Sequence, residues 1–172
     1  MEYFEIYDAL GHSTNKQVPR GTPLKPNEYF MVVHVWIVHS NGTYLIQKRA
    51  KTSDPIPYQW AITTGGALVK ETALDAALRE VKEELGLTIT KTALNKLETI
   101  VSKRNAFHTI THVYLVEQDV DLNTLTLDAS EVQEVAYASL DTIKTMIKDK
   151  LFWDYPYLLN APNYFNKLES RR

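Results

Sequence analysis

The chain has 172 residues, of which 44% are hydrophobic, and this predicts a single globular domain over residues 1–172 with enough apolar side chains for a core. The formal net charge is −2, from 19 Lys and Arg against 21 Asp and Glu, so we expect no basic field of the kind that binds nucleic acid. Cysteine is absent, which excludes disulfides, thiolate zinc sites and cysteine nucleophiles.

The first residues, MEYFEIYD, are acidic and lack the charged and apolar regions of a signal peptide. No apolar segment approaches the length of a membrane span. We therefore expect a cytoplasmic protein with no membrane partner.

The first third of the chain predicts mainly strands. Residues 29–38, with FMVVHVWIV at their centre, are almost continuously apolar and rich in β-branched side chains, which is typical of a strand buried on both faces. Asn41-Gly42 predicts a type I′ turn from this strand into a hairpin partner. The other expected strands are 3–8, 44–49 and 60–63, with an irregular connection over 11–26 and a loop over 51–58.

A helix of roughly three to four turns is predicted between Thr72 and Gly86. Thr72 and Asp75 have the spacing of a capping box, and Gly86 stands where a helix favours a left-handed residue. One face is apolar, so we expect it to pack on a sheet. That face carries Ala73, Ala77, Val81 and Leu85, with Leu74 and Leu78 alongside.

The second half of the chain predicts two paired strands, a third strand and a helix. The strands are expected at 97–103, 109–117 and 135–140, and the helix at 142–150 with Asp141 as its N-cap; an acidic loop covers 119–130. An aromatic tail follows, which could complete the core, form a homodimer contact or line a substrate pocket. It contains Trp153, Tyr155, Tyr157, Tyr164 and Phe165. This order of elements predicts an α+β sandwich with a mixed sheet between helices.

The other side of the first helix carries three glutamates. Glu80, Glu83 and Glu84 stand at i, i+3 and i+4, which places their carboxylates on about one turn, and Lys82 points elsewhere, so no basic residue is expected to relieve them. One interpretation is a solvated acidic face. The other is a site for a hard divalent cation such as Mg²⁺, which prefers carboxylate oxygens and the phosphates of a substrate.

The pattern from Gly65 to Leu87 resembles the signature of the Nudix hydrolases at every fixed position. The resemblance implies an α/β/α sandwich and an enzyme that hydrolyses a diphosphate linked to another moiety. It also implies that Glu80, Glu83 and Glu84 bind Mg²⁺ or Mn²⁺. Glu71 and Arg79 would hold the loop and orient these ligands, and Gly65 would let the backbone pass close to the helix.

A second resemblance covers VVHVWIVHSNGTYLIQKRAK and the following W-x-x-x-x-GG, which look like the Nudix subgroup related to isopentenyl-diphosphate isomerase. It implies that Arg49 and Lys51 bind the diphosphate. Those isomerases use a cysteine before the signature, where this chain has Thr63-Thr64. With one of two proton-transfer groups missing, hydrolysis is favoured over isomerisation. His34, alone in an apolar strand, is interpreted as a hydrogen-bonded core residue rather than a metal ligand.

The expected reaction is metal-assisted attack of water on a small-molecule diphosphate. Glu83 is the first candidate for the general base. Outside the signature the candidate is Glu131, followed by Glu134 as the second choice. Two alternatives stay open, an isomerase-like protein and a non-catalytic module that senses a nucleotide. Aromatic side chains that could line the pocket are Tyr29, Phe30, Tyr58, Trp60, Phe107 and Trp153.

Overall fold

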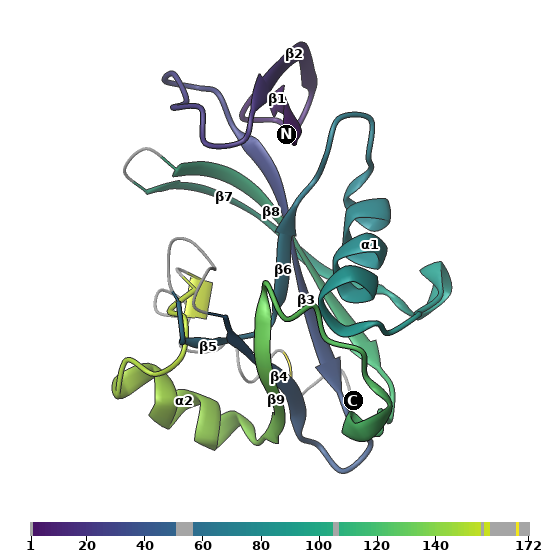
Figure 1. Cartoon of the computed structure of the whole chain (residues 1–172). Helices are drawn as coiled ribbons and strands as arrows, with labels where there is room; N and C mark the ends of the chain where they lie inside the picture. Colours follow the sequence, from purple (N-terminus) through teal and green to yellow (C-terminus); the bar gives the residue numbers. More distant parts are fainter. Residues whose placement is uncertain (1, 51–56, 105–106, 156, 159–167, 169–172) are drawn as a thin grey trace.

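The computed structural model describes residues 2–50, 57–104, 107–155, 157–158 and 168, with residues 104 and 107 described by their backbone alone. A mixed seven-stranded sheet lies between helices α1 (Ala73–Leu85) and α2 (Leu140–Lys148), and a separate two-stranded hairpin stands at one end (Figure 1). The predicted α/β/α sandwich is thus confirmed. The hairpin is β1 (Tyr3–Tyr7) and β2 (Ser13–Pro19), and the sheet contains β3 (Phe30–Val38), β4 (Tyr44–Arg49), β5 (Trp60–Ala61), β6 (Thr63–Gly66), β7 (Asn95–Arg104), β8 (Phe107–Glu117) and β9 (Val132–Ala138).

Strand β3 is the central strand of the sheet and is buried on both faces, as predicted. It pairs in parallel with β8 and antiparallel with β6. Its side chains alternate between two cores because successive residues of a strand point to opposite faces. Val33, Val35 and Ile37 face the core under α1, whereas Trp36 and Val38 face the core under α2 and the tail.

The predicted hairpin between β3 and β4 is wrong in its turn type and in most of its pairing. A type I′ turn needs a positive φ at two residues, but only Gly42 has one, at 91°. The His39 N–H donates to the Thr43 carbonyl at 2.8 Å, which closes a three-residue loop over 40–42, and the Gly42 N–H donates to the His39 carbonyl at 2.8 Å within it. Strand β4 meets β3 only at the Val38–Tyr44 pair and otherwise pairs with β9 and β5.

The predicted irregular connection over 11–26 is also wrong in part, because residues 13–19 form strand β2. This strand pairs with β1, and all of its side chains except Val18 are exposed, so it shows no apolar alternation. The hairpin is fixed to the sandwich at two places. Reciprocal backbone hydrogen bonds join Tyr7 and Tyr29 at 2.9 and 3.0 Å, and an isolated bridge joins Phe4 to Leu68.

Helix α1 has the limits and caps that the sequence predicts. The Thr72 hydroxyl accepts from the Asp75 N–H at 3.1 Å, and the Asp75 carboxylate accepts from the Thr72 N–H at 3.4 Å. Gly86 ends the helix in the left-handed conformation with φ 67°. The alanine side of the helix packs on the sheet, which fixes the direction in which the glutamates point.

The elements after α1 follow the prediction with shifted boundaries. Strands β7 and β8 pair antiparallel as expected, the 119–130 loop contains a short 3-10 helix at Leu122–Thr124, and a second one lies at Lys91–Ala93. Strand β9 begins at Val132, three residues early. The N-cap of α2 is Ser139 and not Asp141, because the Ser139 hydroxyl accepts from the Thr142 N–H at 3.1 Å.

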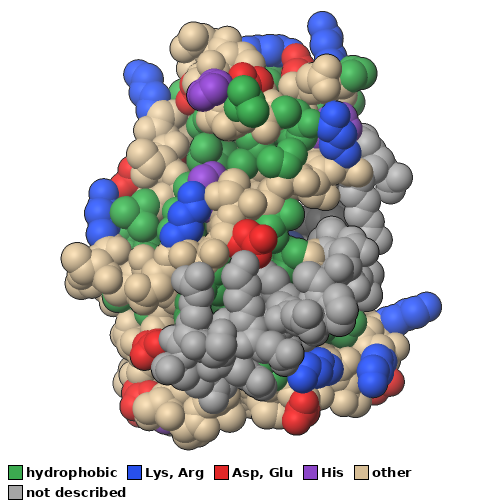
Figure 2. Space-filling model, turned by 180° about the vertical axis from the view of Figure 1, so that it is seen from behind, with side chains coloured by type: hydrophobic (Ala, Val, Ile, Leu, Met, Phe, Trp, Pro, Cys, Tyr) green, Lys and Arg blue, Asp and Glu red, His purple; other side chains and the backbone are tan. Residues whose placement is uncertain are grey.

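The described part of the aromatic tail completes the core. Tyr155 and Tyr157 are buried and their rings stack at 5.7 Å, while Tyr164 and Phe165 lie outside the described residues. Within the described residues, no helix is long and apolar enough to cross a membrane. On the face shown in Figure 2, Lys and Arg side chains are scattered among acidic and polar ones rather than gathered in one basic patch.

Candidate active site

A cleft of about 270 Å³ lies where the β6–α1 loop, the end of β4, the N-terminal hairpin and the aromatic tail meet. It collects charged side chains from segments that are far apart in the sequence. Six of the site residues predicted from the sequence line it: Arg49, Gly65, Arg79, Glu80, Glu83 and Glu131. The rest of the lining is Glu2, Phe4, Arg20, Val32, Ala61, Thr64, Gly66, Leu68, Trp153 and Tyr155.

Gly65 is required by its contact with α1. A Cβ atom on Gly65 would lie 1.9 Å from both Cδ and Oε1 of Glu80, far inside any allowed contact. Its φ is not in the left-handed region, so the requirement for glycine is purely one of space. The glycine thus lets the Glu80 carboxylate lie directly against the β6 backbone, as the sequence interpretation proposed.

Arg79 holds the carboxylates and the loop together. Its guanidinium donates to both oxygens of Glu71, at 2.7 and 3.0 Å, and to the Gly66 carbonyl at 2.9 Å. It also donates to Glu80 at 2.8 Å and to Glu83 at 2.9 Å. The expectation that no basic residue relieves the glutamates is therefore wrong, and the reason is visible in the sequence, since Arg79 and Glu83 are four residues apart on one helix face.

Glu84 points away from Arg79 and into the sheet. It is only 2% exposed, and one of its oxygens accepts from the Gln47 side-chain amide at 2.8 Å. Gln47, on β4, is itself buried, and the Thr63 hydroxyl lies 3.5 Å from its amide oxygen. The three glutamates therefore occupy different environments: Glu83 is exposed at the cleft, Glu80 is mostly buried and Glu84 is fully buried.

The electrostatics of the two buried glutamates differ from those of ordinary surface carboxylates. Burial raises the pKa of Glu80 to about 7, although the charge and hydrogen bond of Arg79 oppose the shift. Burial, with the nearby charge of Glu80, raises the pKa of Glu84 well above its ordinary value. Glu71 is the contrast: burial raises its pKa, but hydrogen bonds from Arg79 and the Leu68 N–H outweigh that effect and lower it. Two desolvated carboxylates thus lie near one another.

These residues fit a hard divalent cation in chemistry. Among the described residues, no three His, Asp or Glu side chains already surround a point where a metal ion could lie. The hydrogen bonds named above, however, use one oxygen each of Glu80, Glu83 and Glu84 within the described part of the chain, which leaves the second oxygen of each carboxylate to a cation. The donors are all oxygens, as Mg²⁺ and Mn²⁺ prefer.

Arg49 and Glu131 line the same cleft. The backbone ties them together, since the Ala50 N–H donates to the Glu131 carbonyl at 2.7 Å. Glu134 does not line the cleft and lies 3.8 Å from the Lys48 amine. Lys51 falls outside the described residues.

His34 is a core residue, as expected. Its Nδ1 lies 3.1 Å from the Tyr157 hydroxyl, and its ring packs against Tyr155 and Tyr157. Burial lowers the pKa of His34 to about 3, so the imidazole is neutral.

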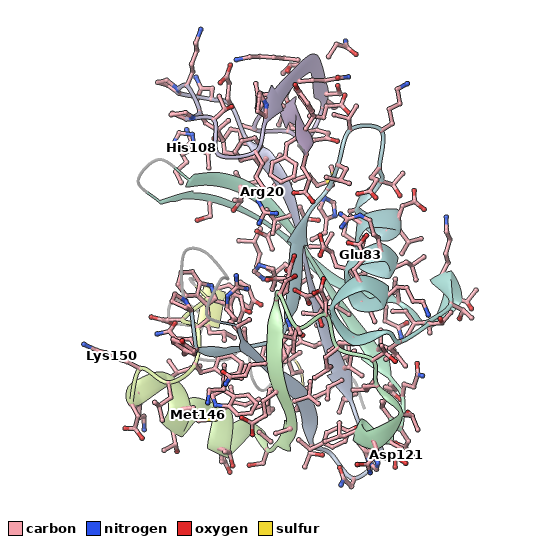
Figure 3. The ribbon with its side chains drawn as sticks, viewed as in Figure 1. Arg20, Glu83, His108, Asp121, Met146 and Lys150 are labelled. Carbon is pink, nitrogen blue, oxygen red and sulfur yellow. The ribbon has the colours of Figure 1, made fainter. Side chains whose placement is uncertain are left out.

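The sequence interpretation missed the contribution of the N-terminal hairpin to the cleft, which is Glu2, Phe4 and Arg20. Figure 3 shows Arg20 below the hairpin, on the side of the molecule where α1 carries Glu83. Of the aromatic candidates, Trp153 lines the cleft, whereas Tyr29 belongs to a separate buried cluster. The only signal for Arg20 was its place in a Pro-Arg-Gly turn, which says nothing about direction.

The fold and the cleft define a class of protein: an α/β/α sandwich in which one capped helix presents glutamates to a cleft that also contains arginines. A model of the NUDIX domain family matches residues 28–160, and the chain therefore belongs to the Nudix hydrolases. It is an enzyme of that family.

Known relatives agree with this assignment. The chain is 33% identical over 160 residues to the Nudix hydrolase lin0387 of Listeria innocua, which covers 92% of both chains. It is 31% identical over 170 residues to Nudix hydrolase 3 of Arabidopsis thaliana, covering 93% of this chain and 22% of the plant protein.

Solved structures show the same fold. DR0079 from Deinococcus radiodurans matches with a TM-score of 0.74 at 18% identity, over 90% of this chain and 93% of that one. A bifunctional NMN adenylyltransferase/ADP-ribose pyrophosphatase from Francisella tularensis, complexed with AMP and Mn, matches with a TM-score of 0.61 at 23% identity, over 85% of this chain and 43% of that one.

Proposed function

We propose that this Nudix hydrolase is a divalent-metal-dependent pyrophosphohydrolase that cleaves the diphosphate of a nucleoside-diphosphate-type small molecule. The observation that carries the proposal is the cleft itself, which Arg49 lines together with the desolvated Glu80 and the exposed Glu83. The presence of AMP and Mn in the Francisella tularensis enzyme supports the choice of metal and substrate class. We further propose that residues 1–172 act as a single domain; a cytoplasmic location and a homodimer remain predictions.

Glu80, Glu83 and Glu84 would hold the cation, and Mg²⁺ or Mn²⁺ bound there would neutralise phosphate charge and lower the pKa of a bound water. Arg49 binds a phosphate oxygen of the substrate through its guanidinium. Arg79 and Glu71 keep Glu80 and Glu83 in position.

The proton of the attacking water goes to a carboxylate. Glu83 and Glu131 are the two candidates because both line the cleft, and Glu134 is set aside because it does not. A Gln substitution at the base abolishes proton acceptance without changing the size of the side chain, so the two candidates can be ranked by turnover and by the acid limb of the pH–rate profile.

The test is an assay of phosphate and phosphomonoester release from a panel that includes ADP-ribose and nucleoside triphosphates, with Mg²⁺, Mn²⁺ or EDTA. We expect one substrate class to be cleaved with either metal and none with EDTA. Glu83→Gln and Glu84→Gln should each lower kcat about 10²–10³-fold, since each removes a charge from the place where transition-state charge develops.

Glu117→Gln is the matched control, because Glu117 is exposed at the end of β8 and does not line the cleft. Glu84→Gln should melt at or above the wild-type temperature without metal, because burial already disfavours the Glu84 charge. Near wild-type turnover in both Glu83→Gln and Glu84→Gln would refute the metal assignment. Substrate binding without cleavage under every metal condition would favour the sensing alternative.

A further inference from the structure

The N-terminal hairpin lies outside the part of the chain that the family model matches, residues 28–160, yet it forms one wall of the cleft. It is attached to the loop between β6 and α1. The Val69 N–H donates to the Tyr3 carbonyl at 3.2 Å, and the Phe4 ring lies so close to Gly66 that a Cβ there would be 2.9 Å from it. The hairpin wall is therefore positioned by the loop that carries Glu71.

The backbone that presents Arg20 is fixed by a turn. The Thr22 N–H and hydroxyl both donate to the Pro19 carbonyl, at 3.1 and 2.7 Å, and Gly21 takes the left-handed conformation with φ 86° that such a turn requires. The Arg20 N–H donates to the Glu2 carbonyl at 3.0 Å. The guanidinium thus starts from a rigid point at the rim of the cleft.

The Arg20 side chain is paired with Glu2 and lies in the field of the active-site carboxylates. Its Nη1 donates to Glu2 at 2.8 Å, and the two side chains are 60% and 47% exposed. The hydrogen bond that Arg20 donates to Glu2 raises the pKa of Arg20 most, and the charges of Glu131 and Glu80 raise it further. An exposed pair of this kind contributes little to stability, so a stronger anion can replace Glu2 at small cost.

Among the described residues, three arginines line the cleft, and Arg79 is the one held by the carboxylates of the signature itself. Arg79 is held by Glu71, Glu80 and Glu83, so it serves the protein and not the substrate. A diphosphate carries at least two charged phosphoryl groups, and a planar guanidinium suits phosphate oxygens in bidentate geometry. Arg20 enters the cleft from the hairpin and Arg49 from the end of β4, which gives a grip from two separate elements.

We propose that Arg20 is a substrate-binding residue that takes a phosphate oxygen of the diphosphate, and that Glu2 holds its guanidinium at the cleft until the substrate replaces the Glu2 carboxylate. The inference rests on the proposed function for its substrate class. With Arg20 in this role, the N-terminal hairpin contributes to the active site although it lies outside the family signature.

The test uses methylene diphosphonate, a diphosphate analogue that cannot be hydrolysed, with Mg²⁺ in titration calorimetry. We expect Arg20→Ala to weaken binding about tenfold, because a charge-assisted hydrogen bond to phosphate is lost, and Arg20→Lys to weaken it less. Glu2→Gln should tighten binding about threefold, because it removes the competing carboxylate, and should have no effect in the Arg20→Ala background. Binding of Mn²⁺ alone should not change in any of these variants.

Lys16→Ala is the matched control, since Lys16 is on the same hairpin, pairs with Glu28 at 2.7 Å and does not line the cleft. Binding by Arg20→Ala within about twofold of wild type, with Arg49→Ala weakened, would overturn the inference and leave the proposed function standing. A wild-type protein that does not bind the analogue would overturn both. If Arg20→Ala is poorly folded, Glu2→Gln decides: failure to tighten binding overturns the inference.

Discussion

Replacing Gly65 by alanine tests whether the close approach of β6 to α1 positions a metal ligand. The new Cβ would lie 1.9 Å from the Glu80 carboxylate, and ordinary contact begins at 3.4 Å, so the carboxylate must move by about 1.5 Å. The backbone of Gly65 suits alanine, and Glu80 is a flexible side chain, so the fold should tolerate the change.

A displacement of this size is large for catalysis, where a misplacement of about 1 Å can lower the rate about 10²-fold. We therefore expect Gly65→Ala to lower kcat by about two orders of magnitude and to weaken Mn²⁺ binding, with little change in melting temperature. The measurements are steady-state kinetics with the best substrate, calorimetric titration of Mn²⁺, and thermal melting followed by circular dichroism.

The control is a double-mutant cycle with Glu80→Ala, which removes the group that the new methyl would strike. If the reasoning is right, adding Gly65→Ala to Glu80→Ala costs almost nothing further, since the two changes act through one contact. Additive losses, or a Gly65→Ala enzyme that keeps half of its turnover and its Mn²⁺ affinity, would refute it.

Three further predictions concern Arg79, which holds the carboxylates, the buried His34, and Arg49, which is proposed to bind phosphate. Arg79→Lys should weaken Mn²⁺ binding and lower the free energy of unfolding by about 3 kcal/mol. The reason is that one ammonium cannot replace the five hydrogen bonds that Arg79 donates to Glu71, Gly66, Glu80 and Glu83. An unchanged melting curve would contradict this. His34 has a pKa of about 3 in the folded protein against an ordinary 6.5, so the unfolded chain binds more protons and the free energy of unfolding falls as the pH drops from 6.5 towards 3. Between pH 6.5 and 5, urea melts should show a loss of about 2 kcal/mol that is absent in His34→Gln. Parallel pH profiles of the two proteins would disprove it. Arg49→Ala should raise KM about tenfold and leave Mn²⁺ binding intact, and an unchanged KM would remove Arg49 from the site.

Apolar periodicity and capping residues in the sequence predict the features of this protein that depend on interactions between neighbouring residues. The limits of α1 follow from Thr72, Asp75 and Gly86 because capping hydrogen bonds and a left-handed C-terminal residue are decided within one turn. The continuous apolar run of β3 gave its burial on both faces, since a strand can hide such a run only between two layers. The signature from Gly65 to Leu87 then indicated the family, which the comparisons confirm.

Tertiary structure decided what depends on long-range pairing and on side-chain direction. Strand β2 has almost no apolar pattern and exists because β1 pairs with it, so its sequence could not reveal it. Strand β4 shares one residue pair with β3 and otherwise pairs with β9, some ninety residues later, and a pairing across that separation leaves no local signal in the sequence. The packing of the hairpin and the sheet around α1 gives Glu80, Glu83 and Glu84 their different environments. It also places Arg20 at the cleft. The spacing of residues within the helix predicts neither feature.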